Sequence, residues 1–81
     1  MEVMIKMPDL STTDGSDILI VKWVAGVGDL VERGQVLLEV ETDKAVQEVE
    51  CIFKGTLTAQ LAPAGAAVPV GAVIASIEVE R

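Results

Sequence analysis

A short polar segment, Glu41-Thr42-Asp43-Lys44-Ala45, carries the residues of this sequence that are best suited to chemistry. It lies between two apolar stretches, residues 36–40 and 46–51. Asp43 favours a turn because its side chain can hydrogen-bond nearby backbone amides. Lys44 is then expected at or beside the tip of a hairpin, with its amine in solvent. Such an amine on a flexible stem can accept an acyl group, although a lysine on a turn is usually an ordinary solvated charge.

The remaining composition argues against a self-contained active site. The chain has no histidine, and so lacks the commonest general base and the commonest transition-metal ligand. Cys51 is the only cysteine, which excludes an internal disulfide and a cysteine metal cluster. Its alternation with Val49 and Phe53 predicts a small buried apolar residue. We therefore expect no catalytic residue and no metal ligand in this chain.

Size and charge narrow the possible partners. Eighty-one residues predict one domain, residues 1–81, with a modest core. A net charge of −7 repels phosphate backbones and anionic lipid, so we expect neither nucleic acid nor a membrane surface as partner. The uncharged stretch 55–77 is broken by Pro63 and Pro69 into turns, which excludes a membrane span. No signal peptide is recognisable, and the isolated domain is expected to be a monomer.

An internal repeat organises the chain. A displacement of 37 positions brings Gly28 onto Gly65 and Gly34 onto Gly71. Six apolar positions coincide around these glycines: Ile20 with Leu57, Val24 with Leu61, Val31 with Val68, Val36 with Val73, Leu37 with Ile74, and Val40 with Ile77. We expect half-repeats of approximately 18–41 and 55–78, each containing two strands with a short valine segment between them. The four glycines are expected in turns that need a positive φ.

The elements that must position Lys44 are strands. Alternation of period two predicts strands over residues 3–7, 18–24, 36–40, 46–51, 56–61 and 73–79. In the third of these, Val36, Leu38 and Val40 are expected to share one face. No segment has an apolar stripe of period 3.6. The prediction is an all-β flattened barrel or sandwich of antiparallel strands, with pseudo-two-fold symmetry.

With these elements in place, the sequence resembles the lipoyl domains of 2-oxo acid dehydrogenase complexes. The matching segments are Met7-Pro8-Asp9-Leu10, Val21-Lys22-Trp23, Gly28-Asp29-Leu30-Val31, Gly34-Gln35-Val36-Leu37 and Glu41-Thr42-Asp43-Lys44-Ala45. Gly34 precedes Lys44 by ten residues, and Gly55 follows it by eleven. The resemblance covers essentially the whole chain. Its specificity comes from the lysine motif standing in register with the glycines and the repeat.

The resemblance implies a fold of two four-stranded antiparallel sheets and a function at Lys44. Lipoic acid would be attached to Lys44, with Glu41, Thr42, Asp43 and Ala45 recognised by the lipoylating enzyme. The lipoylated lysine would be a swinging arm that moves acyl groups and reducing equivalents. The chain would be a non-catalytic carrier domain of the acyltransferase component of a 2-oxo acid or acetoin dehydrogenase complex.

The partners implied by the resemblance are the enzymes that act on such an arm. They are a thiamine-diphosphate decarboxylase component, an acyltransferase core, dihydrolipoyl dehydrogenase, and a lipoate ligase or lipoyl/octanoyl transferase. A loop at residues 11–17 would lie near Lys44 and help the decarboxylase to recognise the domain. The expected location is the bacterial cytoplasm, or the mitochondrial matrix in a eukaryote. The chain would be either an excised domain or a stand-alone carrier.

The acidic residues around the lysine allow two interpretations. Glu39, Glu41, Asp43 and Glu48 either steer the tip toward basic rims on partner enzymes or form a solvated edge that blocks strand-to-strand aggregation. Both roles are compatible with one surface.

Other functions remain as alternatives. A biotinyl carrier shares the expected fold, but its lysine usually has methionine on both sides, whereas Asp43 and Ala45 flank Lys44 here. The lipoylated carrier of glycine cleavage is generally longer. An unmodified β-barrel interaction module would make Lys44 an incidental charge. A hydrolase with an acid pair at Asp14 and Asp17 would need a cleft, and the sequence implies none. A calcium loop on Asp9, Asp14 and Asp17 lacks the ligand spacing of a calcium hand.

Overall fold

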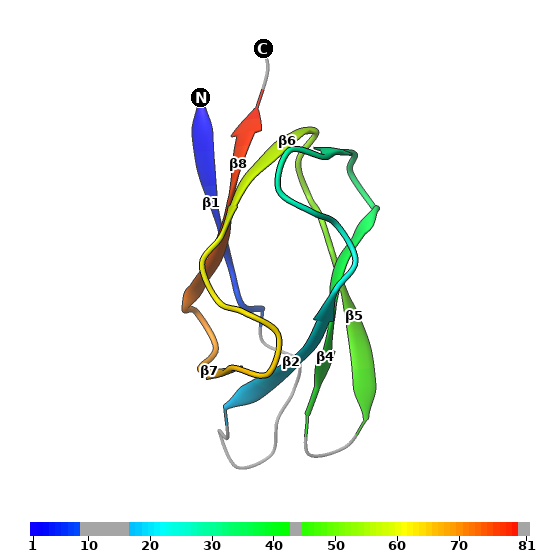
Figure 1. Ribbon diagram of the computed structural model, residues 1–81, viewed down its shortest axis with the longest axis vertical. Helices are drawn as coiled ribbons and strands as arrows, with labels where there is room; N and C mark the ends of the chain where they lie inside the picture. Colours follow the sequence, from blue (N-terminus) through cyan, green and yellow to red (C-terminus); the bar gives the residue numbers. More distant parts are fainter. Residues whose placement is uncertain (9–16, 43–44, 80–81) are drawn as a thin grey trace.

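Eight β-strands form the secondary structure of residues 1–8, 17–42 and 45–79, the part of the chain that this computed structural model describes. They are β1 (Glu2–Lys6), β2 (Ile18–Trp23), β3 (Leu30–Val31), β4 (Val36–Glu41), β5 (Val46–Glu50), β6 (Gly55–Gln60), β7 (Ala67–Val68) and β8 (Val73–Val79). They pair into two four-stranded sheets of order β1-β8-β6-β3 and β5-β4-β2-β7, with antiparallel neighbours throughout (Figure 1). The predicted all-β fold is confirmed.

The core lies between the two sheets. Apolar side chains of the long strands fill it, and those with no exposed surface are Ile18, Ile20, Leu37, Leu38, Val40, Leu57, Ile74, Ala75 and Ile77. Trp23 packs against this core and donates a hydrogen bond from Nε1 to the Ala62 carbonyl at 2.9 Å. Cys51 is buried as predicted, and its Sγ donates to the Phe53 carbonyl. The core therefore joins strands of both halves of the chain.

The halves are locked together by matched hydrogen bonds. Gly28 N donates to the Leu57 carbonyl at 2.7 Å, and 37 positions along, Gly65 N donates to the Ile20 carbonyl at 2.7 Å. Ile20 and Leu57 are themselves 37 positions apart, so a rotation that interchanges the two halves converts each of these hydrogen bonds into the other. This reciprocity is what a pseudo-two-fold axis requires.

Strands β1 and β5 complete the symmetry. Cys51 N donates to the Gln35 carbonyl, and Met7 N donates to the Ala72 carbonyl, both at 2.8 Å. These donors immediately follow β5 and β1, so β1 stands beside β8 as β5 stands beside β4. The chain termini, at the end of β8 and the start of β1, therefore occupy the position that corresponds to the β4–β5 connection.

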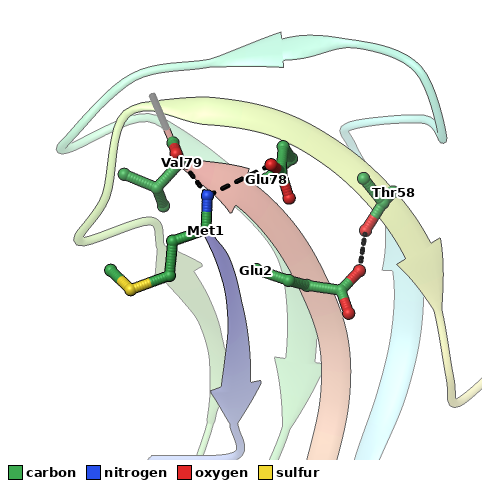
Figure 2. Close-up of polar contacts among 5 residues, drawn as sticks. All are labelled: Met1, Glu2, Thr58, Glu78 and Val79. Carbon is green, nitrogen blue, oxygen red and sulfur yellow. Dashed lines mark hydrogen bonds and ion pairs between the residues drawn. The ribbon is translucent and has the colours of Figure 1, made fainter. Parts of the chain in front are cut away.

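The N-terminus is fixed to β8 at this corresponding position. Figure 2 shows the Met1 ammonium donating to the Val79 carbonyl at 3.0 Å and to Glu78 Oε1 at 3.1 Å. Nearby, Thr58 Oγ1 donates to Glu2 Oε2 at 3.2 Å. The start of β1 and the end of β8 thus lie side by side at one end of the molecule (Figure 1).

A bulge changes which residues of β4 face the core. The register against β5 shifts between Val36 and Leu38. Leu37, expected on the opposite face, is as fully buried as Leu38 and Val40, whereas Val36 is half-buried. An extra residue in one strand of a pair locally breaks the two-residue alternation. The predicted sharing of one face by Val36, Leu38 and Val40 is therefore wrong at Val36.

Glycine is needed for two different reasons. Gly34 and Gly71 each have φ of 89°, and Gly28 and Gly65 are similar at 94° and 92°, which confirms the predicted positive-φ turns. Gly55 instead lies buried in β6, where a Cβ atom would collide with the Glu78 carbonyl of the neighbouring β8. Close approach of the two strands, and no turn, explains this fifth glycine.

Alanine substitution should separate the turn glycines from an ordinary one. We expect Gly34→Ala and Gly71→Ala each to lower the free energy of unfolding by about 1–3 kcal/mol, because alanine is strained at this φ. Gly26→Ala is the matched control, since Gly26 lacks a positive φ and its added Cβ would make only ordinary contacts with Asp29. Urea denaturation of the three variants tests this. Equal stability of all three would contradict the assignment of strain.

Candidate functional site

The predicted site lies where β4 connects to β5. Glu41 pairs with Val46 in the ladder, so Thr42 and Ala45 form the next pair and leave a two-residue connection. Asp43 and Lys44 make up that connection and lie outside the described residues. Of the five predicted site residues, the structure therefore places Glu41, Thr42 and Ala45, and it brings them together at one end of the β5-β4-β2-β7 sheet.

Thr42 closes the hairpin with its side chain as well as its backbone. Its amide donates to the Ala45 carbonyl at 2.9 Å, and its Oγ1 donates to the same carbonyl at 3.2 Å. The Ala45 amide in turn donates to Thr42 Oγ1 at 3.3 Å. Thr42 is only 9% exposed, so its hydroxyl is committed to the hairpin. Sequence reasoning treated Thr42 only as a flank, although hydroxyl-to-backbone bonds are common for threonine beside turns.

Carboxylates collect on the outer face of this sheet. Glu41 and Glu48 are exposed, and Glu39 lies directly opposite Glu48 across the β4–β5 ladder. Lys22 Nζ lies 3.5 Å from Glu39 Oε2, an ion pair between an exposed lysine and a partly buried glutamate. Asp43, the fourth predicted acid, is outside the described part. The predicted acidic surround is thus realised at Glu39, Glu41 and Glu48, close to the connection that contains Lys44.

Two exposed apolar residues flank Glu41, and sequence reasoning did not single them out. Leu19 of β2 and Val46 of β5 are its direct neighbours across the sheet, with 37% and 56% exposure. The corresponding row of the other sheet is Thr56, Glu78 and Glu2. The two ends of the molecule therefore share a backbone plan and differ in surface chemistry.

The loop predicted to assist recognition enters the sheet beside the same hairpin. Residues 9–16 lie outside the described part, which leaves only Asp17 of that loop, and it is exposed. Leu19, two residues later, pairs with Glu41 at the end of β4. Ten residues separate Met7 from Ile18, whereas only three separate the corresponding Cys51 and Gly55. The half that carries the hairpin thus has seven residues more than the fold requires.

Little else in the described residues suggests another site. An open hollow of about 540 Å³ lies at the β3–β6 edge of the other sheet, lined in part by Leu30, Gln35 and Lys54. Within residues 1–8, 17–42 and 45–79, no three acidic or cysteine side chains gather as a metal site would need. Asp9 and Asp14 of the alternative acidic sites are outside these ranges. The same ranges contain no helix long and apolar enough to cross a membrane.

Glu39 and Glu48 lie directly opposite each other, and we expect their repulsion to lower the free energy of unfolding. Like charges directly across a ladder are unfavourable, so Glu48→Gln should raise the free energy of unfolding by about 0.2–1 kcal/mol at low salt. Glu50→Gln is the matched control, because it removes the same charge from the same strand but faces Val36. Urea titrations at low and high salt test the difference, which salt should diminish. A larger gain from Glu50→Gln would show that only net charge matters.

Comparison with known proteins places this geometry in a family. The family model described as "Biotin-requiring enzyme" matches residues 3–77. A dihydrolipoyllysine-residue acetyltransferase component of the pyruvate dehydrogenase complex from Rhizobium meliloti is 42% identical over 83 residues, which cover 99% of this chain and 18% of that protein. The same component from Zymomonas mobilis is 42% identical over 76 residues, with 93% and 17% covered.

A third relative carries a different description. A pyruvate dehydrogenase E1 component subunit beta from Rhizobium meliloti is 46% identical over 65 residues, covering 80% of this chain and 14% of that protein. This chain thus spans less than a fifth of each of these three relatives.

A solved structure has the same arrangement of strands. It is the lipoyl domain of the 2-oxoglutarate dehydrogenase complex from Azotobacter vinelandii, with a TM-score of 0.75 at 24% identity, covering 94% of this chain and 95% of that one. At this identity the likeness concerns the fold. Together with the family match over residues 3–77, it identifies the chain. The chain belongs to the family of biotin- and lipoyl-attachment domains, and its two sheets have the fold of a lipoyl domain.

Proposed function

We propose that this chain is a lipoyl carrier domain, with lipoic acid attached through an amide to Lys44. The observation that carries the proposal is the two-residue connection between Thr42 and Ala45, closed by three hydrogen bonds at the end of a rigid sheet. The residues on both sides of the lysine are thus held at the end of the sheet. Family membership makes this lysine the candidate for modification.

The described surroundings suit a covalently attached group. Thr42 is buried, but Glu41, Ala45 and Val46 are all exposed, so the surface beside the connection leaves room for an approaching enzyme. When attached, a lipoyl group supplies a dithiolane that can be reductively acylated, pass on the acyl group and be reoxidised. The chain itself provides attachment, orientation and an acidic surface. No catalytic residue is needed, and we assign none.

We propose the partners from the complex to which the relatives belong. Those relatives are described as acetyltransferase and E1 beta components of pyruvate dehydrogenase. We assign to this chain a thiamine-diphosphate decarboxylase, an acyltransferase core and dihydrolipoyl dehydrogenase as partners, and a lipoate ligase or lipoyl/octanoyl transferase as the modifying enzyme. Tethering the group confines the intermediate near successive active sites. The proposed location is the bacterial cytoplasm or the mitochondrial matrix.

Biotin is the second candidate cofactor, because the matching family model is described as a biotin-requiring enzyme. The residues beside the lysine favour lipoic acid. Biotinyl domains usually have methionine on both sides of their lysine, whereas this chain has Asp43 and Ala45. The acetyltransferase relatives carry dihydrolipoyllysine in their descriptions. Lipoic acid is therefore the group we propose.

Modification should depend on one lysine. Incubation with ATP, lipoate and a lipoate ligase should add one lipoyl group to the wild type and none to Lys44→Arg, since a guanidinium is a poor nucleophile at neutral pH. Lys22→Arg and Lys54→Arg are matched controls on the described surface, and both should still be modified. Intact mass and peptide mapping give the result. Continued labelling of Lys44→Arg would remove Lys44 from this role.

The parallel reaction with ATP, biotin and a biotin ligase decides between the two cofactors. Exclusive modification by biotin would replace the lipoyl proposal. If a folded sample accepted neither group, the unmodified interaction module would become the leading function.

The seven additional residues of the β1–β2 connection should contribute to recognition by the decarboxylase component more than to folding. Removing residues 11–17 should preserve cooperative unfolding and lipoylation, because the corresponding connection of the other half manages with three residues. Reductive acylation by the decarboxylase component should fall by at least about ten-fold, equivalent to roughly 1.4 kcal/mol of transition-state stabilisation. Steady-state assays with lipoylated samples test this. An unchanged rate would show that the loop has no part in recognition, and loss of folding would show that the residues are structural.

A further inference from the structure

Thr42 has a natural comparison within the same molecule. Under the displacement of 37 positions its counterpart is Val79. The counterpart of Ala45 is Met1, because β1 corresponds to β5 and Met1 precedes Ala45 by the same 44 positions that separate Met7 from Cys51. In both halves the first residue donates its amide to the carbonyl of the second, at 2.9 Å from Thr42 to Ala45 and 2.8 Å from Val79 to Met1. The two ends therefore share the same backbone hydrogen bond, but only the end with Thr42 has a side-chain hydroxyl beside it.

The reciprocal hydrogen bond differs between the two ends. The Met1 amine donates to the backbone carbonyl of Val79 at 3.0 Å, as Figure 2 shows. The Ala45 amide instead donates to the side-chain Oγ1 of Thr42 at 3.3 Å, and that hydroxyl also donates to the Ala45 carbonyl. A hydroxyl has thus taken the place of a backbone carbonyl at the end that carries the lysine. The Ala45 amide depends on this hydroxyl for its hydrogen bond, and the Ala45 carbonyl accepts from it in addition to the Thr42 amide.

We call the two hydrogen bonds of Thr42 Oγ1 to Ala45 the threonine clamp. The sequence of the connection explains why this clamp is useful. Two-residue hairpin turns strongly favour Asn-Gly, Asp-Gly or Gly-Gly, because both central residues need unusual backbone angles. Asp43-Lys44 contains no glycine, so the connection has a weak intrinsic preference for one turn geometry. Ala45 is joined directly to Lys44. The hydrogen bonds of Thr42 therefore fix the residue that follows the lysine in the chain.

We infer that Thr42 is a positioning residue for modification of Lys44, acting through the hydrogen bonds of its hydroxyl to Ala45. The inference rests on the proposed function of Lys44. An enzyme that acylates this amine must bring it into line with an activated acyl group, and small errors of placement slow such transfers strongly. A buried threonine supplies this order without presenting itself to the enzyme. Loss of the hydroxyl should therefore slow the transfer step more than it weakens docking.

The experiment compares variants that differ in this hydroxyl. Thr42→Val removes it with little change of shape, and Thr42→Ser restores it. Thr58→Val is the matched control, because Thr58 Oγ1 also makes hydrogen bonds, to Ser76 and Glu2, but in the half that carries the termini. Initial rates of lipoylation are measured with ATP, lipoate and a lipoate ligase over a range of domain concentrations. Circular dichroism confirms folding at the assay temperature.

We expect Thr42→Val to lower kcat by about ten-fold, the effect of roughly one lost hydrogen bond, with KM changed by less than about three-fold. The kcat of Thr42→Ser should stay within about three-fold of the wild-type value, and the kcat of Thr58→Val should equal the wild-type value. Hydrogen exchange at the Ala45 amide should accelerate in Thr42→Val alone.

Three results would overturn the inference: wild-type kinetics in Thr42→Val, an equal loss in Thr58→Val, or failure of Thr42→Ser to restore the rate. If Thr42→Val does not fold, Thr42→Ala takes its place under the same criteria. Absence of modification in the wild type would instead refute the proposed function, so the two failures are distinguishable.

Discussion

The fold depends on the exchange of hydrogen bonds between the two halves of the chain. Gly28 binds the carbonyl of Leu57 while Gly65 binds that of Ile20, so each half supplies the partner that the other lacks. Each sheet accordingly takes strands from both halves: β6 of the second half pairs with β3 of the first, and β2 of the first pairs with β7 of the second. Neither half has a complete sheet or a covered core by itself. The lysine hairpin is consequently mounted on a frame that exists only when the whole chain has folded.

The same symmetry separates what the fold needs from what has been added to it. One end of the molecule carries the chain termini, held by the Met1 ammonium on Glu78 and Val79. The corresponding end carries a closed hairpin with a threonine clamp, and a connection longer by seven residues enters the sheet beside it. A feature present at both ends is explained by folding. A feature present only at the hairpin end requires another explanation, and the proposed attachment of lipoic acid to Lys44 would supply one.

Surface chemistry follows the same division. Glu39 and Glu48 face one another across the ladder, a placement that folding alone does not favour. Leu19 and Val46 expose apolar surface on either side of Glu41, where the other sheet has polar Thr56 and Glu2. A face that combines repelling acids with exposed apolar groups is well suited to transient contact with basic partner surfaces. The edge-protecting role of these charges is compatible with that use.

The sequence by itself determined the strand pattern, the internal repeat, the positive-φ glycines and the motif around Lys44, because side-chain alternation and turn geometry are local properties. Only the tertiary structure decided the bulge that buries Leu37 beside Leu38, since a bulge depends on the partner strand. The need for Gly55 likewise arises from the approach of the distant Glu78 carbonyl. The hydroxyl of Thr42 acquires its role from Ala45 across the hairpin, and the acid pair arises from register. Contacts between strands determine these features, and such contacts depend on strand pairing and register, which the alternation of side chains along one strand does not specify.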